Sequence, residues 1–176
     1  LVPEPPDILH CHNLHGGYFD LRALPDLSRR IPTVLTLHDA WLLAGHCAHS
    51  FDCERWKTGC GNCPDLSLYP AIRRDRTADN WQRKAEIYRK SQVHVVTPSR
   101  RLMDMVEESV LKPGIVTSRV IPNGVDLKIF HPTAREEARR DLGLPHDEKI
   151  LLFAANGARK NLWKDYGTLQ SALKEI

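Results

Sequence analysis

The sequence predicts an α/β protein in which helices cover a parallel β-sheet. Short apolar runs typical of strands alternate with stretches of helical periodicity along the whole 176-residue chain. The strands are separated by helix-length segments, and this favours parallel pairing through helical crossovers. The composition, 41% hydrophobic and 27% charged, is ordinary for a globular protein with a buried core. We therefore expect a doubly wound sheet.

The first elements are a strand at residues 7–13, a helix at 21–31 and a strand at 33–37. The helix is predicted because its apolar residues recur at near-helical spacing, and two arginines stand at its C-terminal end, where cations suit the helix dipole. The two strands are short apolar runs, and each ends in polar residues. Strand, helix and strand thus follow one another as a crossover unit requires.

A second crossover follows a long loop. Residues 77–91 are predicted to form a helix with Thr77 as its cap, because Trp81, Ala85 and Tyr88 share one face. Residues 92–97 form the next strand, and Pro98-Ser99 begins a helix that extends to about residue 110. Residues 119–122 are a short strand that ends in an Asn-Gly turn.

Beyond this turn the composition changes, which predicts two domains. A charged helix is expected at 134–142, a buried strand at 148–155 and a helix at 163–176. We assign residues 1–122 to an N-terminal Rossmann-like domain, 123–132 to a linker and 133–176 to the start of a second Rossmann-like domain. The chain begins with Leu1 and ends within a helical pattern, so we expect it to be a fragment. No stretch of about 18 apolar residues predicts a membrane helix.

Four cysteines lie in a loop insertion at residues 45–64, with the spacing C-x5-C-x6-C-x2-C. Four thiolates around tetrahedral zinc form the commonest closed structural site, so we expect structural zinc, with two nearby histidines as reserve ligands. Free thiols, two disulfides and an iron–sulfur cluster are the alternatives. The cysteines are Cys47, Cys53, Cys60 and Cys63, and the histidines are His46 and His49.

A second candidate site follows the strand at 33–37. His38-Asp39 stands at its carboxyl end, where ligands bind in open α/β sheets. A histidine there can bind a sugar hydroxyl or a phosphate, or act as a base. His12 and Asn13 end the preceding strand, so their polar groups should meet the same edge. The alternatives are a turn that only satisfies backbone groups, and solvated loop histidines at His12 and His15.

Two basic segments are candidates for anion binding. Arg159 and Lys160 lie in the loop between a predicted strand and a predicted helix, and Lys164 stands one turn further on. Backbone amides at the helix N-terminus and these cations can cradle a diphosphate. A solvated basic turn is the alternative. Between residues 73 and 101 the chain carries nine Lys or Arg, which indicates a solvated helix face, an anionic-membrane surface or a phosphate-binding surface.

Several of these motifs together resemble glycosyltransferase family 4, whose members have the GT-B fold. The matching runs are HCHNLHGGYF (10–19), TLHDAW (36–41), VTPSR (96–100) and IPNGVD (121–126). TLHDAW followed by GHC, DC and GCGNCP is similar to a subgroup that includes colanic-acid and other exopolysaccharide glycosyltransferases. The resemblance spans nearly the whole chain, and IPNGVD is its most specific part.

The resemblance implies retaining transfer from a nucleotide-diphosphate sugar, without a catalytic metal, to a glycan or lipid-linked acceptor. His38 would be the catalytic histidine near the transferred sugar, and His12, Asn13 and Asp39 would lie on the acceptor side. Lys164 best matches the family's lysine, with Arg159 or Lys160 beside it at the donor diphosphate. The family's Gly-rich loop and paired donor-site glutamates match no part of this sequence, so we expect the fragment to be inactive alone.

Three other interpretations compete with this one, and one of them is a catalytically dead scaffold remnant. A GT-B-fold epimerase or phosphorylase would share the architecture. A cysteine-zinc module that binds nucleic acid would need aromatic residues among the basic ones and a freestanding zinc unit, whereas this cysteine loop is inserted in a sheet. We therefore expect no nucleic-acid partner, and a cytoplasmic enzyme, with weak peripheral contact at the inner face of an anionic membrane.

Overall fold

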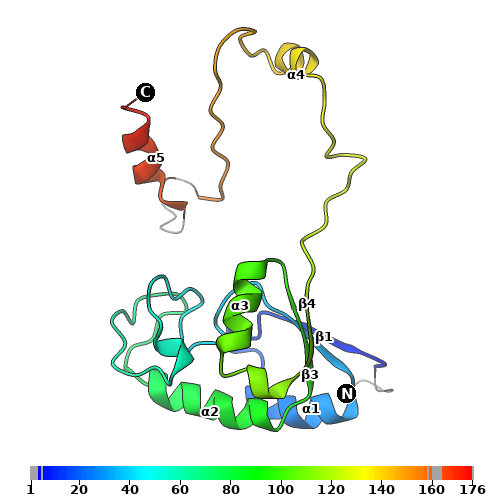
Figure 1. Ribbon diagram of the computed structural model, residues 1–176, viewed down its shortest axis with the longest axis vertical. Helices are drawn as coiled ribbons and strands as arrows, with labels where there is room; N and C mark the ends of the chain where they lie inside the picture. Colours follow the sequence, from blue (N-terminus) through cyan, green and yellow to red (C-terminus); the bar gives the residue numbers. More distant parts are fainter. Residues whose placement is uncertain (1–3, 5, 158, 160–163, 176) are drawn as a thin grey trace. The chain divides into compact units, whose positions relative to one another are not determined.

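The computed structural model describes residue 4 and residues 6–157, 159 and 164–175. The chain divides into two compact units, Leu1–Gly124 and Val125–Ile176 (Figure 1). The functional assignment of the two predicted domains stays a prediction.

The first unit contains one sheet of four strands in the order β1-β2-β3-β4. All neighbouring strands are parallel, with Leu9 paired to Thr33 and Thr33 paired to Val93. Helical crossovers connect strands that are consecutive both in sequence and in space, as sequential parallel pairing requires. The predicted α/β class with a Rossmann-like parallel sheet is therefore confirmed. The strands are β1 (Leu9–His12), β2 (Thr33–Thr36), β3 (Val93–Thr97) and β4 (Ile115–Val120).

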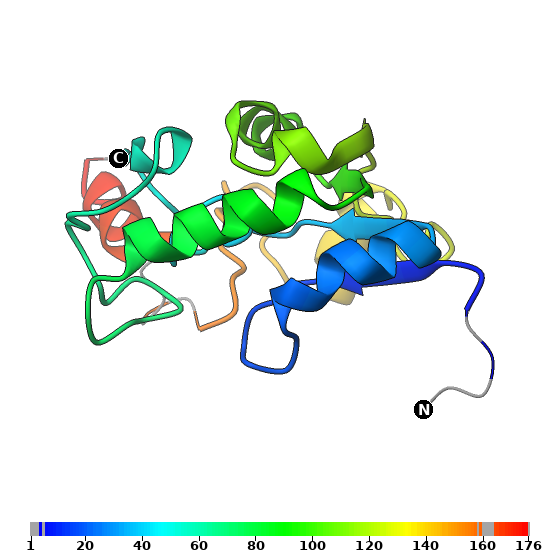
Figure 2. The same cartoon turned by 90° about the horizontal axis from the view of Figure 1, so that it is seen from below.

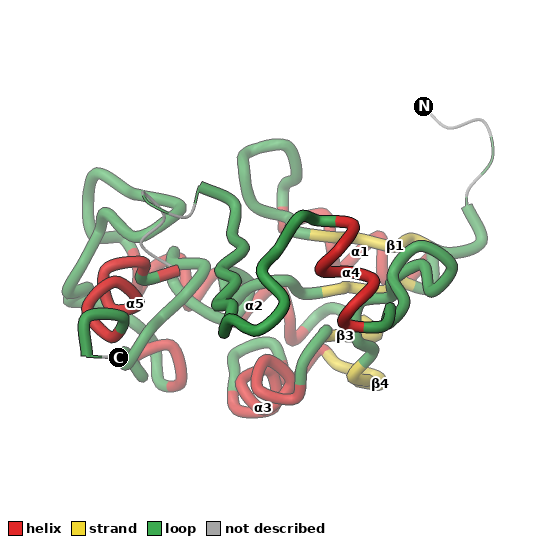
Figure 3. Tube along the Cα trace, turned by 90° about the horizontal axis from the view of Figure 1, so that it is seen from above, coloured by secondary structure: helices red, strands yellow, loops and turns green. Residues whose placement is uncertain are grey.

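The crossovers are helical. A 3-10 turn, η1, and helix α1 connect β1 to β2, helix α2 precedes β3, and helix α3 with the turn η3 leads to β4. Figure 2 shows α1 and α2 side by side, where they contact each other. Between β2 and α2 the chain is almost entirely loop, broken by the short turn η2 (Figure 3). The bounds are η1 (Leu21–Ala23), α1 (Leu24–Arg30), η2 (Arg55–Lys57), α2 (Thr77–Arg89), α3 (Arg100–Glu108) and η3 (Lys112–Gly114).

The helix starts follow from local hydrogen bonding. The Ser99 hydroxyl accepts a hydrogen bond from the backbone N–H of Leu102, as predicted for a helix that starts after Pro98-Ser99. At α2 the prediction of Thr77 as the cap was wrong by position, because Thr77 is the first helical residue. The carboxylate of Asp75 accepts hydrogen bonds from its N–H at 3.0 Å and its hydroxyl at 2.7 Å.

The core lies between the sheet and these helices. Alternate residues of β2 and β3, among them Leu35 and Val95, are buried, as the period of two in a strand requires. Tyr88 of α2 is fully buried, and its hydroxyl donates to the carbonyl oxygen of Leu42 at 2.9 Å. A Cβ atom on Gly114 would lie 2.4 Å from the Tyr88 carbonyl oxygen, so glycine permits this close approach. The hydrogen bond from Tyr88 to Leu42 connects α2 to the loop that follows the candidate His-Asp pair.

Strand β4 begins earlier than predicted. It spans residues 115–120, whereas the sequence indicated 119–122. The first half of the strand was not predicted because Thr117, Ser118 and Arg119 are polar and interrupt the apolar pattern. Each of the three nevertheless pairs with a residue of β3. An edge strand tolerates polar side chains because only one of its sides pairs with the sheet.

The second unit contains two short helices, α4 (Arg135–Asp141) and α5 (Tyr166–Ala172). The prediction of a buried strand at 148–155 was wrong, because this segment forms no strand and Leu152 is 84% exposed. A strand needs a neighbour for its backbone hydrogen bonds, and no strand is found in the described residues of this unit. None of the helices in the described parts of the chain is long and apolar enough to cross a membrane.

Candidate active site

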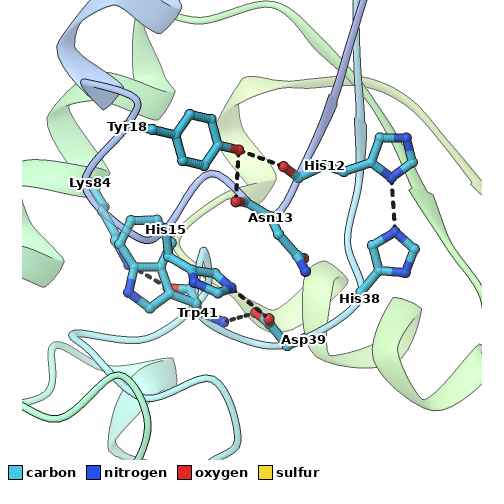
Figure 4. Close-up of polar contacts among 8 residues, drawn as sticks. All are labelled: His12, Asn13, His15, Tyr18, His38, Asp39, Trp41 and Lys84. Carbon is cyan, nitrogen blue, oxygen red and sulfur yellow. Dashed lines mark hydrogen bonds and ion pairs between the residues drawn. The ribbon is translucent and has the colours of Figure 1, made fainter.

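Two histidines meet at the carboxyl ends of neighbouring strands. His12 ends β1, and His38 follows β2, which pairs with β1 up to His12 and Thr36. The Nδ1 atom of His12 lies 2.8 Å from Nε2 of His38, and the two rings stack with centroids 5.2 Å apart (Figure 4). Both side chains are exposed. The parallel register therefore produces the convergence that the sequence predicts.

The loop after β1 is held by Tyr18. Its hydroxyl lies 2.8 Å from the carbonyl oxygen of His12 and 2.9 Å from that of Asn13, and it is the donor to both (Figure 4). Asn13 has a positive φ of 40°, a conformation that asparagine tolerates better than most residues. Tyr18 was missed by sequence reasoning. The backbone bends at Gly16 and Gly17, both of which have positive φ, and the Tyr18 hydroxyl reaches carbonyl oxygens five and six residues earlier. The sequence shows the two glycines but not the direction of this bend.

Asp39 organises the other side of the cluster. One carboxylate oxygen lies 3.0 Å from Nε2 of His15, and the other accepts the backbone N–H of Trp41 at 2.9 Å (Figure 4). The His15 side chain is only 10% exposed, and its ring lies near those of Trp41 and Tyr69. His15 is therefore not the solvated loop histidine expected. Its Nδ1 atom is buried and has no partner among the described residues.

Lys84 of α2 binds the backbone of the loop that follows Asp39. Its side chain is buried at 4% exposure, where its ammonium donates to the carbonyl oxygens of Trp41 and Ala44. The same nitrogen lies 3.8 Å from the centroid of the Trp41 ring. Burial lowers the pKa of Lys84 to about 7. The prediction that Lys84 belongs to a solvated basic face was wrong. The sequence did contain a signal for burial, because Lys84 stands three residues after Trp81 and four before Tyr88 and so shares their face of α2.

The four loop cysteines line one small cavity of about 20 Å³. All are free thiols, and burial raises the pKa of Cys47 to about 11, so its sulfur stays protonated. Cys60 Sγ accepts the backbone N–H of Gly45 at 3.2 Å. Cys63 Sγ lies 3.3 Å from Nε2 of His46 and donates to the carbonyl oxygen of Asp65. Two of the sulfurs are thus already engaged in hydrogen bonds.

This arrangement does not support the expected zinc site. Among the described residues, no group of three or more His, Cys, Asp or Glu is placed to hold a metal ion. The four ligands of a structural zinc ion must converge on one point. The sulfurs of Cys47, Cys53, Cys60 and Cys63 instead surround a cavity within a hydrogen-bonded loop.

The predicted donor residues belong to the second unit. Arg159 and Lys164 are exposed there, and Lys160 lies outside the described residues. Lys164 precedes α5, whose N-cap Asp165 accepts a hydrogen bond from the backbone N–H of Thr168. The donor-diphosphate assignment of these three residues stays a prediction.

The chain is similar in sequence to known glycosyltransferases. The chain is 33% identical over 132 residues to a protein named as a colanic acid biosynthesis glycosyl transferase, WcaC, of Escherichia coli (strain K12), covering 69% of this chain. It is 28% identical over 163 residues to a D-inositol 3-phosphate glycosyltransferase of Catenulispora acidiphila, covering 90% of this chain. The matched regions make up 32% of each relative, so the chain spans about a third of their length.

No solved structure shows significant similarity to the chain. The family model described as Glycosyltransferase Family 4 matches residues 1–129, which include the whole sheet and the histidine cluster. Because this match covers most of the chain, the chain belongs to glycosyltransferase family 4.

Proposed function

We propose that the protein carrying this chain transfers a sugar, with retention of anomeric configuration, from a nucleotide-diphosphate sugar to a glycan or lipid-linked acceptor in polysaccharide biosynthesis. Family membership and the similarity to WcaC support this class of reaction. The observation that carries the proposal is the exposed His12–His38 pair at the carboxyl edge of the sheet, where ligands bind in open α/β folds.

His38 is the residue proposed to act on the substrate. Its Nε2 atom is bonded to His12, and its Nδ1 atom has no hydrogen-bond partner among the described residues. In this proposal Nδ1 of the exposed His38 side chain holds a hydroxyl of the transferred sugar or of the acceptor. His12 fixes the orientation of the ring, as a second partner of a catalytic histidine commonly does. In this proposal His12, Asn13 and Asp39 form the acceptor-side wall.

The proposed catalytic effect is electrostatic. As the bond between sugar and phosphate breaks, negative charge grows on the diphosphate, and cations stabilise it most in the transition state. Arg159, Lys160 and Lys164 are the proposed cations, and no catalytic metal is invoked. The chain spans about a third of its relatives, so we propose that these 176 residues do not complete the transfer alone.

The same proposal places the enzyme in the cytoplasm, with weak contact to an anionic membrane face. Eight of the nine basic residues between 73 and 101 are exposed, and only Lys84 is buried. Exposed lysines and arginines are attracted to anionic lipids within a Debye length of the surface. This attraction supports an acceptor that is linked to lipid.

The natural protein that contains this chain provides the test. It is incubated with nucleotide-diphosphate sugars and lipid-linked saccharides, and release of nucleoside diphosphate is measured with and without acceptor. We expect acceptor-dependent release, and proton NMR should show the product anomer with the configuration of the donor. Inversion would contradict the retaining mechanism, and acceptor-independent epimerisation or phosphorolysis would contradict the transferase itself.

A further inference from the structure

A second cavity lies beside the histidine cluster, in the same unit. Its volume is about 840 Å³, within the range of small-molecule sites. Its walls come from the loop after β1, from both ends of the long loop between β2 and α2, and from one side of α2 between Asn80 and Ile87. The lining residues that matter here are Tyr18, Asp20, Arg22, Trp41, Asn80 and Arg83.

Two polar side chains of α2 line this cavity and have no hydrogen-bond or ion-pair partner among the described residues. Asn80 and Arg83 stand three residues apart in the helix and therefore on one face. In the described part of the chain, neither side chain forms a hydrogen bond or an ion pair. The amide of Asn80 and the five N–H donors of Arg83 are thus available to a ligand.

The charge of the wall favours an anion. Its acidic residue, Asp20, is already bound by the Arg22 guanidinium through contacts of 2.6 and 2.9 Å. The hydrogen bond from Arg22 holds the pKa of Asp20 at about 2, with a smaller contribution from the charge of Arg83. The Asp20–Arg22 pair is therefore neutral as a unit. The charge of Arg83 acts on Asp20 only weakly, and among the described residues Arg83 forms no ion pair. Its planar fork can therefore bind a phosphate or a carboxylate.

The remaining walls suit a sugar or polyol ring. Tyr18, Phe19 and Trp41 line the cavity, and Tyr18 is 67% exposed. Aromatic rings with a few placed polar groups are the usual lining of sites that orient a small ligand.

Two of these walls are bonded to the histidine cluster. Tyr18 donates to the carbonyl oxygens of His12 and Asn13, and the Trp41 N–H donates to Asp39 (Figure 4). A ligand in the cavity would therefore lie next to the residues proposed to meet the transferred sugar. A ligand that contacts Tyr18 or Trp41 would touch residues that are hydrogen-bonded to the loops carrying His12 and Asp39.

We propose that this cavity binds the acceptor, and that the acceptor is a saccharide or polyol carrying one anionic group, which Arg83 and Asn80 hold. The inference rests on the proposed transfer reaction and adds the substrate class. A phosphate and a carboxylate offer Arg83 the same paired oxygens, so the proposal covers both, and the test separates them.

Direct binding to the purified 176-residue chain tests the cavity without requiring activity. Isothermal titration with glucose 6-phosphate, glucuronate and neutral methyl glucoside should give a dissociation constant on the order of 1 mM for at least one anionic sugar. Methyl glucoside should bind at least about tenfold more weakly. The preferred anionic sugar identifies phosphate or carboxylate as the group. Equal binding of all three sugars, or binding of none, would overturn the proposal.

Two arginines of the same helix provide a matched comparison. Arg83→Gln should weaken binding of the preferred anionic sugar about tenfold, whereas Arg89→Gln, also exposed on α2 but outside the cavity, should leave it unchanged. Equal weakening in both variants would show non-specific attraction and reject the site. Unfolding curves of both variants establish that the chain still folds.

Measurements of acceptor and donor KM distinguish a failure of this inference from a failure of the proposed function. In the natural protein, Arg83→Gln should raise the acceptor KM about tenfold and leave the donor KM unchanged. If no transfer occurs with any acceptor, the proposed function fails while the binding result still judges the cavity. If transfer occurs and Arg83→Gln leaves the acceptor KM unchanged, the cavity assignment fails alone.

Discussion

Nδ1 of His12 lies 2.8 Å from Nε2 of His38, and this hydrogen bond joins the ends of two neighbouring strands. A hydrogen bond between two ring nitrogens needs one donor and one acceptor. Only one of these two nitrogens can therefore carry a proton. The bond also leaves Nδ1 of the exposed His38 without a partner among the described residues. The pair thus presents one oriented imidazole nitrogen at the edge where the sheet meets its ligands.

Replacing His38 by alanine should lower kcat of the natural protein tenfold or more, about the effect of losing one positioned hydrogen bond in the transition state. The measurement is steady-state release of nucleoside diphosphate. His94→Ala is the matched control, because His94 lies within β3 and bonds Thr117 of the neighbouring strand. An unchanged kcat in His38→Ala, or an equal loss in His94→Ala, would remove His38 from the reaction.

Asp39→Ala should destabilise the first unit. It removes the acceptor of the Trp41 N–H and of the nearly buried His15, and an unsatisfied polar group costs about 1–3 kcal/mol. Asp39→Asn keeps an oxygen for Trp41 and should lose less. Urea unfolding measures both.

Asp79→Ala is the comparison for this prediction, because it removes an exposed ion pair with Arg76 and should change the free energy of unfolding by less than about 0.5 kcal/mol. A loss in Asp39→Ala no larger than in Asp79→Ala would mean that Asp39 does not organise the loop.

The strand–helix order of the first unit was predictable because local patterns and tertiary packing agree there. β2 and β3 are short apolar runs that end in polar residues, and the helix after Ser99 begins with an ordinary cap. The convergence of His12 and His38 followed from one rule, that parallel strands end at the same edge.

What failed depended on partners distant in sequence. Lys84 looks like one member of a basic run until the carbonyls of Trp41 and Ala44, some forty residues earlier, surround its ammonium. The segment 148–155 has the composition of a strand, but pairing needs a neighbour that the described second unit does not supply. The cysteine spacing is compatible with zinc, but it cannot show whether the ligands converge, and among the described residues no group of three or more is placed to hold a metal ion.

Lys84 should make stability depend on pH. Burial lowers its pKa from the ordinary value of 10.5 to about 7. Below pH 7 the lysine is charged in both states, and the cost of burying the charge is fully present. Between pH 7 and 10.5 the unfolded chain binds the additional proton, so the free energy of unfolding should rise with pH, by at most about 1.4 kcal/mol per unit.

Urea unfolding from pH 6 to 9 under reducing conditions measures this slope. Lys84→Met should remove the Lys84 contribution, whereas Lys90→Met, which changes an exposed lysine after α2, should keep the wild-type slope. The slope is the readout because methionine also leaves the carbonyls of Trp41 and Ala44 without their donor. Identical slopes in wild type and Lys84→Met would refute the prediction.

Cys60→Ser should harm stability before it harms chemistry. Its sulfur accepts the backbone N–H of Gly45, and Gly45 with His46 lines both the cysteine cavity and the proposed acceptor cavity. The shorter C–O bond of serine draws the acceptor away from that N–H, so we expect a loss of about 1 kcal/mol in urea unfolding and little change in kcat. Cys53→Ser is the control, because the Cys53 sulfur accepts no hydrogen bond among the described residues and should cost less. Both are measured with and without a chelator, since destabilisation of the wild type by chelation would assign the loop's stability to a metal instead of to this hydrogen bond.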